Sequence, residues 1–250
     1  MTLADVAGVR VLVTGGTSGL GRAMAQALAE GGARVALTGR DGERARAVAR
    51  ELPGGAVGIG MDVRDPASVE AGVDQIRGML GSVDALINNA GIGMRTVNPQ
   101  FLTRPQPFYQ VPPADFAGLF ATNVLGYFHV ARAVVPEMVQ AGRGKVINVS
   151  INESTMVRAG FAPYGPSRAA TDALSKVMAA DLAGTGVDVA LLLPGGATAT
   201  GMVPDGIPDD VRARLLDPQV MGPPVRWLCS RASDGLRDLR VVATDFAPPA

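Results

Sequence analysis

The chain has 250 residues, of which 47% are hydrophobic and 18% charged, a composition that supports a buried core and excludes an intrinsically disordered protein. Basic and acidic residues number 23 each, so the chain lacks the excess of positive charge that would predict binding to nucleic acid or to an anionic membrane. Charge or glycine interrupts every apolar stretch well before the roughly 20 residues of a membrane span, and the lone cysteine, Cys229, fits a reducing compartment, so we expect a cytoplasmic protein.

Short β-branched segments alternate with helical patterns along the chain. The expected strands are Val9–Val13, Arg34–Thr38, Ala56–Gly60, Val83–Asn88, Lys145–Val149, Val187–Leu193 and Leu239–Thr244. The expected helices include Glu43–Glu51, Pro66–Met79, Pro113–Gln140 and Ser167–Ala183. This alternation predicts right-handed βαβ units. We expect one α/β domain over residues 1–250, a doubly wound parallel sheet of seven strands with helices on both faces, and no signal peptide before the first strand.

A glycine-rich segment from Thr14 to Gly21 joins the first strand to a helical stretch that begins at Arg22. Its glycines allow a tight turn and a close approach of the backbone to a pyrophosphate. Free N–H groups and the positive end of the helix dipole favour an anion at the same place. This strand–turn–helix context indicates a dinucleotide site rather than a plain connector. The residues expected to bind the dinucleotide here are Gly15, Thr17, Ser18, Gly19, Leu20 and Gly21.

Arg40 follows the second strand, where a carboxylate would pair with ribose hydroxyls and an arginine suits a 2′-phosphate. We therefore predict NADP(H) as the cofactor in preference to NAD(H). Asp41 is the competing candidate, because a ribose-binding acid is expected about 20 residues past the glycine loop. Asp41 also precedes a predicted helix, and capping that helix is its simpler role.

Two further segments follow strand ends. Asp62 and Val63 come after the third strand, where a short acid can reach the adenine amino group. Asn89, Ala90 and Gly91 end the fourth strand, where small residues let the backbone approach the cofactor. Either segment alone fits an ordinary turn, but their order after a glycine loop favours cofactor contacts.

Two long segments, residues 91–112 and 195–218, connect the later elements. Long loops in a compact domain are usually functional or disordered. Both leave the carboxyl ends of strands, where open α/β sheets bind their ligands. We predict that both are substrate loops, and the alternative is a role in subunit contacts or none.

Tyr164 and Arg168 form the candidate catalytic pair. On a helix that begins near Tyr164 they are i and i+4, so the phenol and the guanidinium share one face. A phenol has an ordinary pKa of about 10, and a fixed cation nearby favours its charged form. Such a tyrosine can donate or accept a proton at a carbonyl or alcohol oxygen. Taken alone, the pair fits a core or interface tyrosine beside a surface arginine better.

With these motifs in this order, the chain from Val9 to about Cys229 resembles the short-chain dehydrogenase/reductase family in its single-domain, Rossmann-like form. The resemblance implies that the glycine loop and the segment 89–91 bind the dinucleotide. It also implies that Tyr164 is the general acid/base and that Asn123 holds a water molecule of a proton relay.

The resemblance further places the segment after the sixth strand beside the nicotinamide. Pro194 and Gly195 match the family motif there. Thr198 and Thr200 flank the spacing at which the family has its threonine, so both stay candidates for cofactor binding.

The chain departs from the family pattern at two positions. The family has a lysine where Arg168 stands; arginine keeps a permanent charge, but its planar fork differs from an ammonium and it cannot release a proton. The family's second serine, which binds the reacting oxygen, is replaced by Ile151, thirteen residues before Tyr164. Ser150 is adjacent, although strand alternation should direct it to the other face unless a bulge intervenes. The other possible replacements are Asn152, Ser154 and Thr155.

Together these features predict an NADP(H)-dependent oxidoreductase that transfers a hydride between the nicotinamide and a ketone or secondary alcohol. The candidate catalytic residues are Tyr164, Arg168, Asn123 and Ser150, and the partner is a small-molecule substrate. The alternative is a cofactor-binding protein of the same fold that is a redox-neutral lyase, isomerase or cyclase, or a regulatory partner.

The resemblance also implies a homodimer or homotetramer that associates through helices in residues 113–140 and 167–183. No metal site is predicted, because no metal-spaced cluster occurs and the only histidine, His129, fits helix packing or a subunit contact.

Overall fold

Seven parallel strands form one sheet in the structure, a computed structural model that describes residues 4–237 and 239–247. The strands are β1 (Arg10–Val13), β2 (Arg34–Gly39), β3 (Val57–Gly60), β4 (Ala85–Asn88), β5 (Gly144–Val149), β6 (Val187–Leu193) and β7 (Leu239–Val242). They lie in the order β3-β2-β1-β4-β5-β6-β7, and each neighbouring pair is parallel. The predicted doubly wound, Rossmann-like sheet is confirmed.

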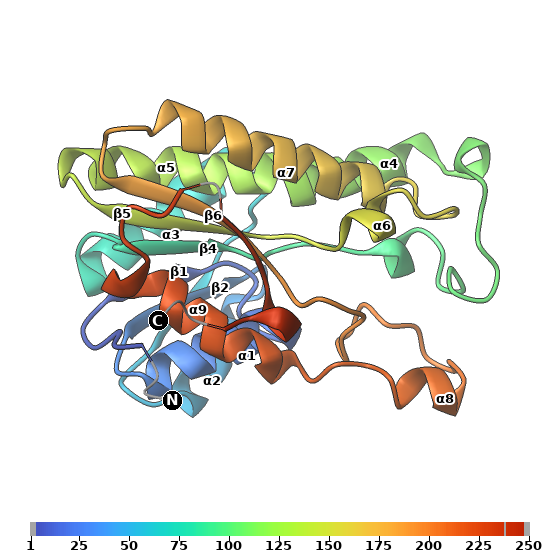
Figure 1. Cartoon of the computed structure of the whole chain (residues 1–250), viewed down its shortest axis with the longest axis horizontal. Coiled ribbons are helices and arrows are strands. Elements are labelled where there is room, and N and C mark those ends of the chain that lie inside the picture. Colours follow the sequence, from blue (N-terminus) through green and yellow to red (C-terminus); the bar gives the residue numbers. More distant parts are fainter. Residues whose placement is uncertain (1–3, 238, 248–250) are drawn as a thin grey trace.

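Helices cover both faces of this sheet (Figure 1). The longer helices are α1 (Gly19–Glu30), α2 (Gly42–Glu51), α3 (Pro66–Leu80), α4 (Pro113–Phe120), α5 (Gly126–Gln140), α7 (Tyr164–Asp181) and α9 (Gly222–Cys229), and the short ones are α6 (Glu153–Met156) and α8 (Asp209–Arg212). Helices α3, α5 and α7 lie on one face, and α1, α2 and α9 lie on the other. Within the described residues, no helix is both long enough and apolar enough to cross a membrane.

Two hydrophobic cores, one on each face, account for the apolar strands. In β1, Val11 and Val13 pack into the core beneath α1 and α9, whereas Leu12 packs into the core beneath α3 and α5. Successive side chains of a strand point to opposite faces, so a strand covered on both faces is apolar without a break. Strand β6 is the extreme case, with all of its residues buried.

The segment 113–140 is not the single helix that its pattern predicts. Helix α4 ends at Phe120, a π turn follows over Ala121–Leu125, and α5 begins after it. The hydroxyl of Thr122 donates to the carbonyl oxygen of Gly118 (3.0 Å), a side-chain bond that competes with the backbone pattern. A π turn inserts one residue without ending the helix, so periodicity did not reveal it. The last predicted strand also ends two residues early, because a 3₁₀ turn begins at Ala243.

The order of the strands reverses between β1 and β4. At such a reversal the neighbouring connections leave in opposite directions, and a crevice opens at the carboxyl ends of the strands. The two long loops, residues 91–112 after β4 and 195–218 after β6, extend from this same end of the sheet together with α8 (Figure 1). The topology therefore brings the glycine loop and both long loops to the carboxyl end of the sheet.

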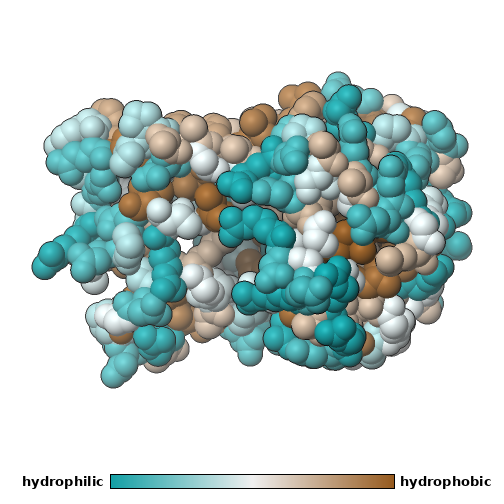
Figure 2. All heavy atoms as spheres, turned by 180° about the vertical axis from the view of Figure 1, so that it is seen from behind, coloured by the Kyte–Doolittle hydropathy of each residue, from teal (hydrophilic) through white to brown (hydrophobic). Residues whose placement is uncertain are grey.

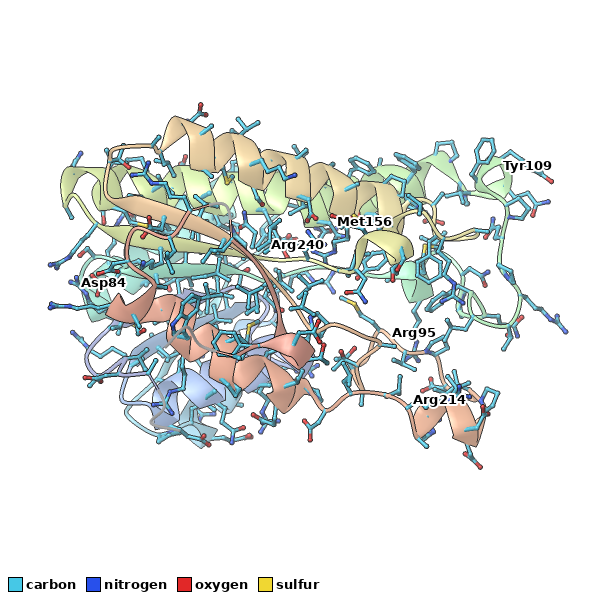
Figure 3. All side chains as sticks on the ribbon, viewed as in Figure 1. Asp84, Arg95, Tyr109, Met156, Arg214 and Arg240 are labelled. Atoms are coloured by element: carbon cyan, nitrogen blue, oxygen red, sulfur yellow. The ribbon has the colours of Figure 1, made fainter. Side chains whose placement is uncertain are left out.

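A partly buried ion pair between Arg10 and Asp84 holds β1 and β4 together at the opposite end of the strands, where Asp84 lies (Figure 3). Arg10 donates to Asp84 through its backbone N (3.0 Å), Nε (2.7 Å) and Nη2 (2.5 Å). Burial alone would raise the pKa of Asp84, but the hydrogen bonds and charge of Arg10 outweigh burial and hold that pKa below its ordinary value.

We predict that Asp84→Asn lowers the free energy of unfolding by about 1–3 kcal/mol at pH 7, because hydrogen bonds to a charged group are lost. The pKa of Asp84 is lower in the folded chain, so its contribution is complete above the ordinary value near 4 and is lost as the pH falls through the folded value. Urea unfolding of both proteins from pH 7 down to pH 3 measures this.

The matched control is Asp210→Asn, which removes a carboxylate from an exposed i,i+4 pair with Arg214 and is expected to cost less than about 0.5 kcal/mol. A penalty for Asp84→Asn that stays constant with pH would contradict the electrostatic origin of the effect.

Candidate active site

The hydroxyl of Thr14 joins the glycine loop to the segment after β4. It accepts hydrogen bonds from the backbone N–H groups of Asn89 and Ala90 (3.0 Å each) and donates to the carbonyl oxygen of Ile87 (3.3 Å). The side-chain amide of Asn89 returns to the loop, donating to the carbonyl oxygens of Thr14 (3.0 Å) and Gly15 (3.1 Å). The sequence pattern gave Thr14 no role of its own, although its place at the strand end was the available signal.

The N-terminus of α1 is open to an anion. Its N-cap residue, Ser18, makes no side-chain capping bond, and the first turn contains no acidic residue. The first backbone N–H groups of α1 carry the positive end of the helix dipole, and neither a capping side chain of Ser18 nor an acidic side chain of the first turn neutralises it. Thr17 packs against Gly39 at the end of β2, and Leu20 continues into the core beneath α1. The predicted loop residues are therefore grouped around one helix terminus.

The residues predicted for the adenosine end lie at the ends of β2 and β3. Asp62 pairs with Arg64, whose Nε lies 2.9 Å from Oδ1 and whose Nη2 lies 2.6 Å from Oδ2. Hydrogen bonding to Arg64, with a smaller contribution from the charge of Arg40, lowers the pKa of Asp62. Asp41 caps α2 by accepting from the backbone N of Arg44 (3.1 Å), which is the simpler of the two roles considered for it.

Val63 is buried next to Asp62, and its carbonyl oxygen lies 3.0 Å from Nδ1 of His129 on α5. The histidine thus joins α5 to the segment after β3, which agrees with a packing role. Within the described residues no group of three or more histidine, cysteine, aspartate or glutamate side chains is placed to hold a metal ion.

Tyr164 and Arg168 lie on the first two turns of α7, as the spacing predicts. Arg168 is only 3% exposed, and its Cζ lies 5.4 Å from the ring centre of Tyr164. Its Nη1 donates to the hydroxyl of Tyr127 on α5 (2.9 Å) and to the carbonyl oxygen of Val149 on β5 (3.1 Å). The guanidinium therefore belongs to the buried interior rather than to the surface.

Arg168 and Tyr127 affect each other's pKa. Burial opposes the charge of Arg168, but interactions with the phenols of Tyr127 and Tyr164 outweigh it and raise the pKa of Arg168 above its ordinary value. Burial raises the pKa of Tyr127, and the charge of Arg168 opposes that rise only in part. The site thus contains the permanent cation of Arg168 beside the neutral phenol of Tyr127. Tyr127 was not among the predicted site residues, because nothing local in its sequence marks it.

Asn123 is fully buried in the π turn between α4 and α5. Its side chain donates to the carbonyl oxygen of Ile92 (3.0 Å) and to the hydroxyl of Ser167 (3.0 Å), and accepts from the backbone N of Ile92 (2.9 Å). Thr171 donates to its carbonyl oxygen (3.1 Å). Asn123 therefore joins the start of the 91–112 loop to α7, one turn from Tyr164.

Ser150 is 1% exposed at the end of β5, and its hydroxyl donates to Asp172 on α7. Asp172 also pairs with Arg240 of β7, whose Nη2 donates to the carbonyl oxygen of Ile151 (2.6 Å). The structure does not bring Ser150 and Tyr164 into a hydrogen bond. Among the possible replacements, Asn152 donates to the carbonyl oxygen of Gly195 (2.9 Å), so its amide lies beside the segment after β6.

The segment after β6 folds back over the glycine loop. Gly195, which follows Pro194, has φ 94°, and a β-carbon there would collide with Thr244. Thr198 is buried and donates to the carbonyl oxygen of Gly196 (3.2 Å), within its own turn. Thr200 instead lies against Gly19, since a β-carbon at that glycine would be 3.1 Å from the Thr200 methyl group. Of the two threonine candidates, Thr200 is the one at the start of α1.

Arg95 connects the two long loops (Figure 3). It donates to the carbonyl oxygens of Gly201 (3.3 Å) and Val203 (3.2 Å) and pairs with Asp205. A cavity of about 780 Å³ lies beneath this contact, between the start of α1 and the loop after β6. Seen from behind, the molecule is hollowed near its middle (Figure 2).

Cys229 is buried in α9, and burial raises the pKa of its thiol to about 12. A thiol that stays protonated is a poor nucleophile, so this cysteine serves packing rather than chemistry.

Comparison with known proteins identifies the family of the chain. The short chain dehydrogenase family matches residues 9–209. Gluconate 5-dehydrogenase of Gluconobacter oxydans is 34% identical over 236 residues, which cover 93% of this chain and 83% of that protein. The 3-oxoacyl-(acyl-carrier-protein) reductase of Escherichia coli is 32% identical over 205 residues, which cover 82% of this chain and 79% of that protein.

Solved structures of dehydrogenases and reductases align with almost the whole chain. A gluconate 5-dehydrogenase from Burkholderia cenocepacia in complex with NADP and tartrate aligns with a TM-score of 0.83 and 29% identity, over 97% of this chain and 98% of that chain. A 3-ketoacyl-(acyl-carrier-protein) reductase from Brucella melitensis complexed with NADH aligns with a TM-score of 0.83 and 28% identity, over 95% and 97%. The chain therefore belongs to the short chain dehydrogenase family and is an oxidoreductase of that family.

Proposed function

We propose that the chain is an NADP(H)-dependent oxidoreductase that transfers a hydride between the nicotinamide and a ketone or secondary alcohol, with Tyr164 as general acid/base. The observation that carries the proposal is the buried Arg168 guanidinium beside the Tyr164 ring, 5.4 Å from its centre. A phenol can exchange a proton with a carbonyl or alcohol oxygen, and the neighbouring guanidinium supplies positive charge where negative charge develops during that transfer.

The glycine loop fits a dinucleotide because its glycines allow a close approach of backbone segments that side chains would prevent. A β-carbon at Gly15 would lie 2.8 Å from the Cα of Ala90. A β-carbon at Gly21 would collide with the carbonyl oxygen of Gly15 and the side-chain amide of Asn89. These two glycines therefore allow the loop, the segment after β4 and α1 to meet closely enough to surround a pyrophosphate. The proposed group is completed by Thr17, Ser18, Gly19, Leu20 and Gly91.

Arg40 supports the preference for NADP(H). It is exposed at the end of β2, and its charge reaches Asp62, the residue assigned to the adenine. A guanidinium in that place can bind the oxygen atoms of a 2′-phosphate bidentately. Relatives have been solved with either cofactor, NADP in one complex and NADH in another.

In the proposed mechanism the bound nicotinamide supplies or accepts the hydride. Tyr164 gives its hydroxyl proton to the carbonyl oxygen during reduction and takes one from the alcohol during oxidation. Arg168 holds a positive charge beside the phenol in both directions, but it cannot pass on a proton.

Asn123 has two tasks in this mechanism. Its side-chain amide keeps the start of the 91–112 loop against α7, and both of its N–H donors are used in doing so. Its backbone carbonyl oxygen accepts from Thr171 and has a second lone pair. We assign the relay water to that carbonyl oxygen.

Both long loops are proposed to enclose the substrate, with Pro194, Gly195 and Thr200 beside the nicotinamide. Phe101 and Phe161 pack edge to face (5.5 Å between ring centres), and Phe161 also lies beside Tyr164 (6.4 Å). An apolar wall of this kind favours a partly hydrophobic ketone or alcohol.

Exposed apolar residues on the two long helices of one face support a homodimer or homotetramer. Phe128 on α5 and Val177 on α7 are the examples. Apolar side chains gathered on a surface mark contacts with other molecules, and a second copy of the chain is the partner we propose.

One observation favours a second candidate function, a redox-neutral enzyme or a regulatory protein that keeps the cofactor. By the resemblance, Ile151 stands where the family's serine would bind the reacting oxygen, and the hydroxyl of the neighbouring Ser150 donates to Asp172. Loss of such a donor costs roughly 10²–10³ in rate where it has been measured in other enzymes. Consumption of NADPH with a panel of ketones and aldehydes separates the two functions.

We predict that Tyr164→Phe lowers kcat for ketone reduction by about 10²–10⁴-fold, because it removes the transferred proton and little else. The dissociation constant of NADPH, measured by cofactor fluorescence, should stay within about twofold. Absorbance of NADPH with a ketone panel measures kcat. A wild-type protein that binds NADPH and consumes it with no member of the panel would exclude the reductase function.

We predict that Arg40→Ala raises the KM for NADPH by about 10-fold or more and leaves the KM for NADH within about twofold, because only NADPH offers the 2′-phosphate. Steady-state kinetics with both cofactors measure this. Arg50→Ala, which removes an exposed charge at the end of α2, is the control and should change neither value. Equal losses with both cofactors would show that Arg40 does not select the phosphate.

We predict that Gly21→Ala weakens binding of NADPH by at least about 10-fold, because its β-carbon would push α1 away from Gly15. Fluorescence titration measures the affinity. Gly78→Ala is the control, since Gly78 lies on α3 with nothing near its β-carbon position, and it should leave affinity unchanged while stabilising the helix by up to about 1 kcal/mol. Unchanged affinity in Gly21→Ala would contradict the proposed dinucleotide site.

A further inference from the structure

Arg168 is a buried charge that phenols, rather than a carboxylate, surround. Its Cζ lies 5.8 Å from the ring centre of Tyr127 and 5.4 Å from that of Tyr164. Among the residues that the structure describes, no acidic side chain forms an ion pair with it. A buried charge is costly unless hydrogen bonds satisfy it, so the groups that bind the guanidinium decide where it can stay.

Two elements, α5 and β5, hold the guanidinium of α7 through a closed triangle of hydrogen bonds. Nη1 of Arg168 donates to the hydroxyl of Tyr127 on α5 (2.9 Å) and to the carbonyl oxygen of Val149 on β5 (3.1 Å). The hydroxyl of Tyr127 donates in turn to the same carbonyl oxygen (3.2 Å). Tyr127 is 1% exposed, so no solvent competes for these bonds.

This triangle uses both hydrogen atoms of Nη1 and fixes the plane of the group. A guanidinium is rigid and planar, so the directions of its other N–H groups follow from those two bonds. Nε is buried without a partner in the described part of the chain. Nη2 lies against Gly91, because a β-carbon on that glycine would collide with it. The Nη2 group therefore lies at the segment after β4 that we assign to the cofactor.

We propose that Tyr127 is a positioning residue for the reaction: its hydroxyl holds Arg168 so that the remaining N–H groups face Tyr164 and the cofactor. The proposal rests on the proposed function. It also accounts for an arginine at this position, since a guanidinium without the phenol would have a second buried N–H unsatisfied, in addition to Nε, and no fixed orientation.

The substitution Arg168→Lys separates this role from a structural one. A lysine side chain ends near the position of the guanidinium carbon and has no atom where Nη1 lies, so it cannot reach Tyr127 in the same way. In that background the hydroxyl of Tyr127 still donates to Val149, so its loss would affect stability but not the charge beside Tyr164. The two positions should therefore be coupled in catalysis.

The test is a double-mutant cycle on the full chain, with wild type, Tyr127→Phe, Arg168→Lys and the double variant. For each protein we would measure kcat and KM with NADPH and a ketone, the dissociation constant of NADPH by fluorescence, and the melting temperature. We expect Tyr127→Phe, made in the wild-type chain, to lower kcat by about 10-fold or more and to weaken NADPH binding several-fold. The same change made in the Arg168→Lys variant should alter both by less than about twofold.

The matched control is Ser233→Ala, which removes another buried hydroxyl that donates to a backbone carbonyl oxygen, that of Leu228 (2.9 Å). It should lower the melting temperature and leave kcat unchanged. If Tyr127→Phe does not fold, Tyr127→Met replaces it in the cycle, because a flexible methionine can fill the buried space without supplying a hydroxyl.

Equal effects of Tyr127→Phe in both backgrounds, or no effect in the wild-type chain, would overturn the proposal. A wild type that binds NADPH but reduces no ketone would refute the proposed function alone, and the cycle in NADPH affinity would then decide the role of Tyr127. A wild type that does not bind NADPH would refute both.

Discussion

The contact between the glycine loop and the segment after β4 is the constraint on which the site depends. Strands β1 and β4 are neighbours where the order of the sheet reverses, and the hydroxyl of Thr14 accepts two backbone N–H groups across that boundary. The amide of Asn89 repeats the connection in the other direction. These bonds leave no space for side chains, and this is why Gly15 and Gly21 are glycines.

The helix that carries Tyr164 is tied to the same framework. Helix α7 contacts the π turn through Ser167 and Asn123, and the end of β5 through Arg168 and Val149. Asp172, one turn further, joins Ser150 to Arg240 of β7. Strand β7 thus helps to fix the end of β5, although it contributes no residue to the proposed chemistry. A charge as deeply buried as that of Arg168 requires such a rigid environment.

Much of the fold was predictable because the strands carry their own signal. A parallel strand covered on both faces is apolar throughout, as β6 is, and a glycine loop between a strand and a helix is typical of a dinucleotide site. The spacing of Tyr164 and Arg168 also gave their shared helix face directly. The break between α4 and α5 was not predictable in this way, because the π turn at Asn123 leaves the helical pattern almost intact.

The sequence by itself determined the alternation of strands and helices, the glycine loop between a strand and a helix, and the shared helix face of Tyr164 and Arg168, since each depends on residues close together in the chain. Only the tertiary structure decided the partners of the charge: Tyr127 comes from α5 and Val149 from β5, and they meet Arg168 across 41 and 19 residues of sequence. It likewise directed Ser150 to Asp172 and set Thr200, rather than Thr198, against Gly19. Local patterns specify the direction of a side chain on its own helix or strand. The partners of that side chain depend on how the helices and strands pack against one another, and no single segment of sequence determines that packing.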